Sequence, residues 1–252
     1  MLGGGARDVT PLEAALVDLV RASWARPARL GPDDLRALRA VAGDGALDYV
    51  FVVGGFHFIN RIADLLHVDA EVLPEALRRF EALRRLSVRM MALMFGRVID
   101  LGNRTDAATW EPLAARIAQR VGRPVDAALT PLRARPRLLE ILALALEERD
   151  ERNALPRATI ARVQRAVEAA LPRAEDEATG LHPRPADPVE AFAFVGTRYA
   201  QRTTPEMIAA LRRAGYDDLG ILDLAITIAD ANNWARLWRW LALPPDISYL
   251  EA

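Results

Sequence analysis

The sequence predicts an all-α protein, and three observations support that class. Apolar residues recur at helical spacing along almost all of the 252 residues. The periodic segments are rich in Ala, Leu, Arg and Glu, which favour helix. Gly, Pro, Asn or Asp stands near each segment boundary, where helices commonly end. We therefore expect helices joined by short breaks.

The first helix is expected over residues 10–25. Thr10 is a suitable N-cap because its side chain can accept a hydrogen bond from the first turn. Pro11 fits the first helical turn, where its missing N–H is not needed, and Glu13 is acidic near the N-terminus. Pro27 then ends the helix.

A short helix should follow Pro32 and end at the glycines near position 43. The next helix, from about Ala46 to His67, is long and strongly apolar. Gly54 and Gly55 lie inside it without the lysine or spacing of a phosphate-binding loop. We interpret this glycine pair as a place where another helix packs closely.

The rest of the chain continues the helical pattern. Prolines are closely spaced between Leu171 and Asp187, and they make this segment the best candidate linker because they prevent continuous helix. Met90, Met91 and Met94 fit a core or a subunit interface. The further expected helices cover residues 74–101, 110–121, 136–149, 156–171, 188–201, 204–214 and 217–243.

The charged composition excludes several kinds of chemistry. The chain has no cysteine, and because it has no lysine all 33 basic residues are arginines. Thiol redox chemistry, thiolate metal sites and Schiff bases are therefore excluded. The 34 acidic residues bring the formal charge to -1, which provides no field for nucleic acid. We expect no nucleic-acid partner.

Two features bear on location. The first residues, Met1 to Arg7, lack the apolar stretch of a secretory signal, so we expect a cytoplasmic protein. The longest apolar run, Tyr49 to Ile59, is shorter than the roughly 20 residues of a membrane span. We interpret it as part of a buried helix and expect no membrane association.

The two ends of the chain share a layout of helix, short helix and long helix. Identity between the two copies is low, but the matched residues keep their order. Two such units would pack around a pseudo-twofold axis with their long helices in the centre. The matched pairs are Pro11 with Pro188, Pro32 with Pro205, Leu38 with Leu211, Ala46 with Ile221 and Arg61 with Arg236.

The long apolar segment carries a resemblance to a known family. It reads Asp48-Tyr-Val-Phe-Val-Val-Gly-Gly-Phe-His57-Phe-Ile-Asn60-Arg61-Ile-Ala-Asp64-Leu-Leu-His-Val68 and is similar to the closing helix of the AhpD-like superfamily. That superfamily contains alkylhydroperoxidase D and the carboxymuconolactone decarboxylases. The second copy, residues 204–223, resembles the helix, glycine and helix that precede such an ending.

The resemblance covers about residues 10–74 and 188–243. It implies an AhpD-like helical bundle of two related three-helix units and assembly into a homo-oligomer. The expected parts are residues 1–74, a central part over 75–187 and a second unit over 188–252, within one compact domain. The peroxidases of the family use a Cys-x-x-Cys motif, which this chain lacks. Thiol peroxidase activity is therefore not expected.

The strongest candidate site lies on the first long helix. His57, Arg61 and Asp64 are spaced by four and three residues, which places them on one helix face. As catalytic residues, His57 would transfer protons, Arg61 would hold a substrate carboxylate and Asp64 would orient the guanidinium. The alternative is structural: an Arg61–Asp64 ion pair, and a His57 satisfied by the backbone.

The second copy adds candidate ligand-binding residues. Asn232 and Arg236 occupy the places of His57 and Arg61, and Asn60 precedes Arg61. If the long helices approach each other, these side chains would suit a small anion or carboxylic acid. The alternative is that the nearby tryptophans close the end of the core and the arginines stack on them.

Two functions remain open. One is a binding or structural homologue without redox cysteines, which holds a small acidic ligand. The other is a cysteine-independent lyase or decarboxylase acting on a small carboxylic acid or lactone. No metal site is expected, because His57 and His67 lie about 15 Å apart along a helix that rises about 1.5 Å per residue. No cofactor is expected either.

Overall fold

A computed structural model describes residues 9–67, 110–121, 124–152, 154–172 and 185–243, and every regular element in these ranges is a helix. The predicted all-α class is thus confirmed. The expected helix over 74–101 and the Met90, Met91 and Met94 group lie outside the described residues.

The first helix, α1 (Pro11–Ala25), begins as the sequence predicts. The Thr10 hydroxyl accepts the N–H of Glu13 at 3.2 Å, and the Glu13 carboxylate accepts the N–H of Thr10 at 2.8 Å. This reciprocal pair is a capping box, and Pro11 fills the first turn. The helix ends before Pro27.

The long helix of the first unit is α3 (Ala46–Leu66), and short helices lead into it. Gly43 stands at the break with φ at +56°, a conformation that favours glycine. Between α1 and α3 lie η1 (Pro27–Arg29), η2 (Pro32–Leu35), α2 (Arg36–Ala42) and η3 (Gly43–Gly45).

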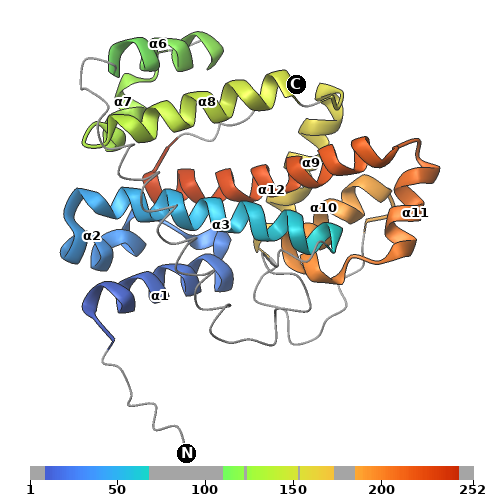
Figure 1. Cartoon of the computed structure of the whole chain (residues 1–252), viewed down its shortest axis with the longest axis horizontal. Coiled ribbons are helices and arrows are strands. Elements are labelled where there is room, and N and C mark those ends of the chain that lie inside the picture. The colour runs from blue at the N-terminus through green and yellow to red at the C-terminus, as the bar shows by residue number, and fades with distance from the viewer. Residues whose placement is uncertain (1–8, 68–109, 122–123, 153, 173–184, 244–252) are drawn as a thin grey trace, which may run out of the picture.

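The central part of the chain adds further helices. Figure 1 shows α6, α7 and α8 on one side of the long helices, and α9 packs on α10 and α12. The ion pair between Arg135 and Asp48, at 3.4 Å, joins this part to α3. The helices are α6 (Trp110–Val121), α7 (Asp126–Leu129), η5 (Thr130–Leu132), α8 (Pro136–Arg152) and α9 (Arg157–Ala170).

The second unit repeats the layout of the first. Asp217 caps its long helix by accepting the N–H of Gly220 at 2.8 Å. Thr204 stands at the N-cap of the short helix, although its side chain makes no capping hydrogen bond. The elements are α10 (Pro188–Arg198), η7 (Ala200–Arg202), α11 (Pro205–Arg213) and α12 (Asp218–Leu241).

The backbone of the two units matches at the turn after the first helix. Arg26 has φ and ψ of -143° and 55°, and its counterpart Tyr199 has -147° and 54°. Each residue is followed by a 3-10 helix and then by an extended residue. The long helices also end alike, because His67 and Ala242 both adopt the left-handed conformation. The internal repeat therefore extends to local backbone geometry.

The units pack around the two long helices. Helices α3 and α12 lie side by side and antiparallel through the middle of the molecule (Figure 1). Helix α3 also packs on η7 of the second unit, and α12 packs on η1 and η2 of the first. Each long helix thus contacts the turn of the opposite unit. These contacts bring side chains from both units together between α3 and α12.

The glycine pair of α3 has two different environments. A Cβ at Gly54 would lie 2.5 Å from Oδ1 of Asn233 and 3.4 Å from Cδ2 of Leu237, both on α12. A Cβ at Gly55 would meet no atom within 4 Å. Only Gly54 therefore serves the close packing that the sequence suggested.

We expect Gly54→Ala to lower the free energy of unfolding by about 1–2 kcal/mol, because Asn233 must move. The neighbouring Gly55→Ala is the matched control. It should leave stability unchanged or raise it by up to about 1 kcal/mol, since alanine favours helix. Urea denaturation of both variants measures this difference. Equal effects would contradict the assigned packing.

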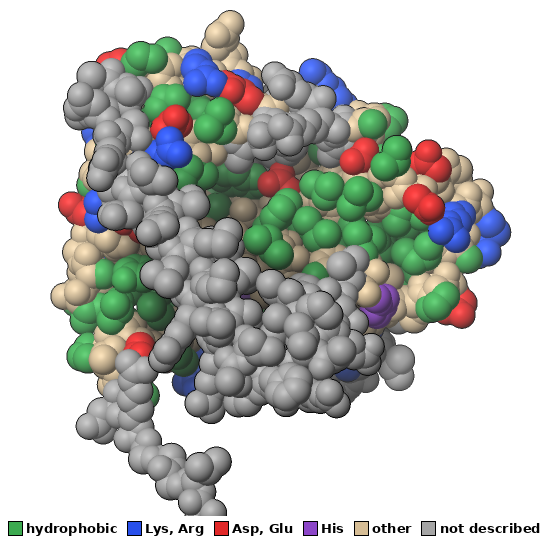
Figure 2. Space-filling view, viewed as in Figure 1, with side chains coloured by type: hydrophobic (Ala, Val, Ile, Leu, Met, Phe, Trp, Pro, Cys, Tyr) green, Lys and Arg blue, Asp and Glu red, His purple; other side chains and the backbone are tan. Residues whose placement is uncertain are grey.

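Apolar side chains gather on one outer surface over α3 and α12 (Figure 2). Phe56 and Ile59 of α3 and Leu219 and Leu222 of α12 are exposed. The helical stretch Pro32–Leu66 also contains a segment long and apolar enough to cross a membrane by length and composition alone. The core helix of a soluble protein can meet the same criterion.

Candidate functional site

Polar side chains from both units meet in the interior between α3 and α12. His57 and Arg61 come from α3, and Asn232 and Arg236 come from α12. Their exposed fractions are 5%, 4%, 0% and 2%. The structure thus brings together four of the residues that the sequence singled out. We call them the arginine centre.

Arg61 reaches from α3 to the last turn of α10. Its Nη1 donates to the carbonyl oxygens of Gly196 and Thr197, the latter at 3.0 Å. The end of a helix has carbonyl groups without helical partners and a partial negative charge, so a guanidinium is favourable there. Its Nε is fully buried and has no hydrogen-bond partner among the described residues.

Arg236 makes the mirrored contact from α12 to the last turn of α1. Its Nε donates to the carbonyl oxygen of Ser23 at 3.1 Å, and its Nη1 donates to the carbonyl and the side-chain oxygen of Asn232 at 2.8 and 3.2 Å. Ser23 and Gly196 are counterparts in the repeat. Each arginine therefore binds the helix end of the opposite unit, as a pseudo-twofold axis requires.

His57 contacts its own unit. Its Nε2 lies 2.7 Å from the Ser23 hydroxyl, which in turn donates to the carbonyl oxygen of Val20 at 2.7 Å. Since the hydroxyl has one proton, the second bond leaves Nε2 as the donor to Ser23. The imidazole also packs against Trp24, with ring centroids 5.1 Å apart. His57 is held by packing and hydrogen bonding together.

Asn232 takes the place of His57 in the second unit. Its Nδ2 donates to the Thr197 hydroxyl at 3.1 Å and to the carbonyl oxygen of Ile228 at 2.9 Å. Its Oδ1 accepts from Arg236. Every polar atom of this amide has a partner, which explains how a fully buried amide is tolerated.

The arginine centre concentrates positive charge in a desolvated place. Burial, and then the charges of Arg236 and Arg61, lower the pKa of His57 from 6.5 to about 3, so the imidazole is neutral at physiological pH. Burial lowers the pKa of Arg61 to about 10. Burial and the charge of Arg61 also lower the pKa of Arg236.

No carboxylate of the described residues lies within ion-pair distance of Arg61 or Arg236. Asp64 is half-buried and acts on Arg61 only through its charge, which raises the pKa of Arg61. The ion pair that the structural alternative assigned to these two residues is therefore not formed. The two guanidiniums are balanced mainly by carbonyl dipoles.

Asn60 lies apart from the other predicted site residues. It is exposed on α3, and its side chain makes no hydrogen bond to the described part of the chain. The neighbouring Arg61 points inward because one residue rotates a helix by about 100°. The structure thus separates Asn60 from the arginine centre.

Beside the arginine centre, Arg239 pairs with Glu168 of α9 at 2.8 Å. Its guanidinium carbon lies 5.5 Å from the ring centroid of Trp238. Trp234 and Trp238 are buried, which agrees with tryptophans closing the core beside the arginines. This stacking involves Arg239, whereas Arg236 turns to Ser23.

Sequence reasoning missed the partners at the two helix ends. Ser23 and Trp24 line up with Gly196 and Thr197 when the repeat is extended toward the end of each first helix. These positions differ in residue type between the units, so side-chain patterns gave no signal. What the two units share at these positions is a backbone carbonyl oxygen, which every residue type has.

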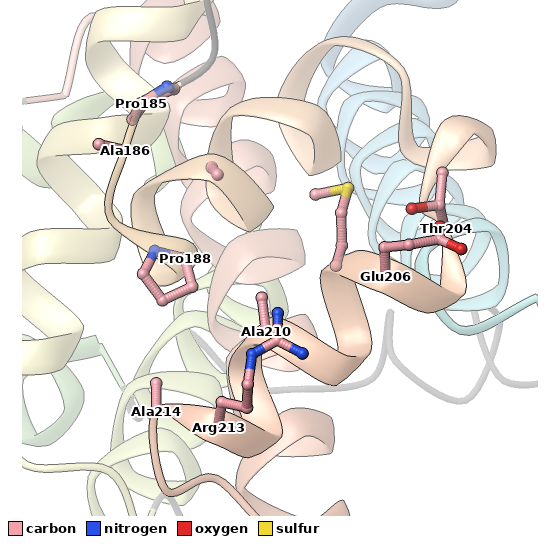
Figure 3. Close-up of a pocket in the computed structure, with 10 residues that line it drawn as sticks. Pro185, Ala186, Pro188, Thr204, Glu206, Ala210, Arg213 and Ala214 are labelled. Atoms are coloured by element: carbon pink, nitrogen blue, oxygen red, sulfur yellow. The ribbon is translucent and has the colours of Figure 1, made fainter.

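A surface groove of about 550 Å³ lies between the start of α10 and α11 (Figure 3). Its walls are mainly alanine and proline, with Glu206 and Arg213 as charged side chains. Hydrogen bonds from its own backbone and from Thr204 lower the pKa of Glu206. The groove contains no residue of the arginine centre.

Within the described residues, no group of three His, Cys, Asp or Glu side chains converges on a possible metal ion. The arginine centre therefore remains the main concentration of functional groups in that part of the chain. No family model, no curated protein and no solved structure matches the chain.

Proposed function

We propose that the chain is an AhpD-like protein, related to carboxymuconolactone decarboxylases and alkylhydroperoxidases, which acts as a non-peroxidase binding or structural homologue. The resemblance of its long helix and its internal repeat support the family. The absence of cysteine supports a role without thiol chemistry. Its ligand is a small acidic molecule held at the arginine centre.

The observation that carries this proposal is the pair of buried arginines, for which the described part of the chain provides no carboxylate within ion-pair distance. A buried charge is costly unless it is paired, and both guanidiniums are almost fully buried. An acidic ligand would provide the missing negative charge. The buried Nε of Arg61, which has no partner among the described residues, is a donor suited to it.

The alternative function is a cysteine-independent lyase or decarboxylase that uses His57 and Arg61. The position of His57 beside the Arg61 guanidinium favours it, because the pair could move a proton and hold a carboxylate, although a pKa of about 3 makes His57 a weak base. Its burial against Trp24 and Ser23 favours the binding role instead, since a base must reach the substrate. A pH-rate profile with small lactones would distinguish the two functions.

A thermal-shift screen of small carboxylic acids and lactones tests the proposal. We expect at least one acid to raise the Tm of the wild type by about 5 °C at a hundred times its Kd. Arg61→Gln should remove the shift, because it removes the guanidinium. The exposed Arg36→Gln is the matched control and should keep it. No shift with any compound would favour a purely structural role.

Assembly and location follow as proposals from the same family resemblance. The exposed apolar side chains over α3 and α12 support a homo-oligomer, because large exposed apolar patches commonly mark interfaces. The cytoplasm remains the proposed location. No role for nucleic acid, membrane, metal or cofactor is proposed.

A further inference from the structure

The half-exposed residue Trp24 separates the arginine centre from solvent. Its side chain is 52% exposed, whereas His57 and Arg61 beneath it are 5% and 4% exposed. The ring centroids of Trp24 and His57 are 5.1 Å apart, and the guanidinium carbon of Arg61 lies 6.0 Å from the indole centroid. Trp24 therefore touches both the solvent and the buried charges.

The opposite side of the arginine centre is closed. The counterpart of Trp24 in the repeat is Thr197, which is 6% exposed and accepts the Asn232 amide. A Cβ at the adjacent Gly196 would lie 2.9 Å from side-chain atoms of Leu65 and Ile228. Since this side is tightly packed, a small molecule would enter on the Trp24 side.

The charges around the centre set the charge of the ligand. Among the described residues, Arg61, Arg236 and Arg239 are positive, and the carboxylates that act on them are Asp64 and Glu168. Three positive and two negative groups leave one positive charge, with His57 neutral. One negative charge would balance it, whereas a divalent anion would leave a buried excess of negative charge.

The free donors set the position of the ligand. Arg61 uses Nη1 for carbonyl groups, and Arg236 uses Nε and Nη1. The remaining donors include the buried Nε of Arg61, which has no partner among the described residues. Because the surrounding side chains are almost fully buried, the ligand must be an anion of a few atoms.

We propose that the arginine centre binds a small monovalent anion, such as a short carboxylate, which enters past Trp24. This proposal rests on the proposed binding function. The anion accepts a hydrogen bond from Nε–H of Arg61 and balances the one remaining positive charge. The Trp24 indole covers it and must move for entry and exit.

Iodide quenching of tryptophan fluorescence tests this proposal. Iodide is itself a small monovalent anion, and Trp24 is the one exposed tryptophan among the five of the chain; the buried ones are Trp110, Trp234, Trp238 and Trp240. We expect a saturable component of quenching that acetate competes away at constant ionic strength. Neutral acrylamide should show only the linear, collisional component.

Amino-acid substitutions distinguish iodide binding at the arginine centre from collisional quenching of Trp24. Arg61→Gln should lose the saturable component, and the exposed Arg36→Gln should keep it. Circular dichroism checks the fold, and Arg61→Lys replaces Arg61→Gln if the latter unfolds, since lysine keeps a charge but lacks the Nε donor. Trp24→Phe should lose the quenching, because the other four tryptophans are buried.

Strictly linear quenching of the wild type, equal to that of Arg61→Gln, would overturn the proposal. Competition by sulfate as strong as that by acetate would overturn the monovalent class; we expect sulfate to be at least about tenfold weaker. Either result would leave the binding function standing if another acid still gave the Arg61-dependent thermal shift. The experiments can therefore reject the monovalent-anion proposal without rejecting the proposed binding function.

Discussion

Arg236→Ala should lower the free energy of unfolding by about 2–4 kcal/mol. The variant leaves the buried carbonyl of Ser23 and the side-chain oxygen of Asn232 without their donor, which costs about 1–3 kcal/mol for each acceptor. It also leaves a cavity where a fully buried side chain stood. The substitution also removes the charge repulsion between Arg236 and Arg61, which stabilises the variant. The net loss of stability is therefore smaller than the sum of the hydrogen-bond and cavity costs.

Urea denaturation measures this loss of stability, and two further variants show which part of it comes from the lost volume and which from the lost charge. Arg236→Met fills most of the volume and removes the charge, so it should cost less than Arg236→Ala. Arg36→Ala removes an exposed arginine and should change stability by less than about 0.5 kcal/mol. A loss of less than about 1 kcal/mol for Arg236→Ala would contradict the structural importance of its hydrogen bonds.

The boundaries of the longer helices were predictable because local chemistry sets them, whereas the short helices α7 and η5 were not predicted. The Thr10 and Glu13 capping box and the prolines at the first turns act within a few residues, so a single sequence shows them. The contact between Gly54 and Asn233 was not predictable, since it depends on how two distant helices cross.

The candidate site was predictable in part for the same reason. The repeat matched Arg61 with Arg236, and this pairing indicated that the two residues would meet if the long helices did. The hydrogen-bond partners of the two arginines could not be predicted. Each guanidinium binds a backbone carbonyl oxygen of the opposite unit, and every residue type has such a carbonyl. The half-exposed position of Trp24 likewise follows from packing alone.

Acid should destabilise the protein through His57. The pKa of this side chain is about 3 in the folded state and 6.5 as its ordinary value. Between these pH values the unfolded chain binds a proton that the folded chain does not, so stability falls as pH falls. The contribution is fully present above about pH 6.5 and is lost progressively toward pH 3.

His57→Asn isolates this contribution, because asparagine is the residue that the second unit uses at the same place and it does not titrate. Between pH 7 and pH 4 the wild type should lose about 3 kcal/mol more stability than His57→Asn. Urea denaturation at pH values from 4 to 7 gives the difference. Parallel pH profiles for the wild type and His57→Asn would mean that His57 is protonated in the folded state. The imidazolium would then lie beside two guanidiniums, and the arginine centre would have to hold a negative charge that its own side chains do not provide.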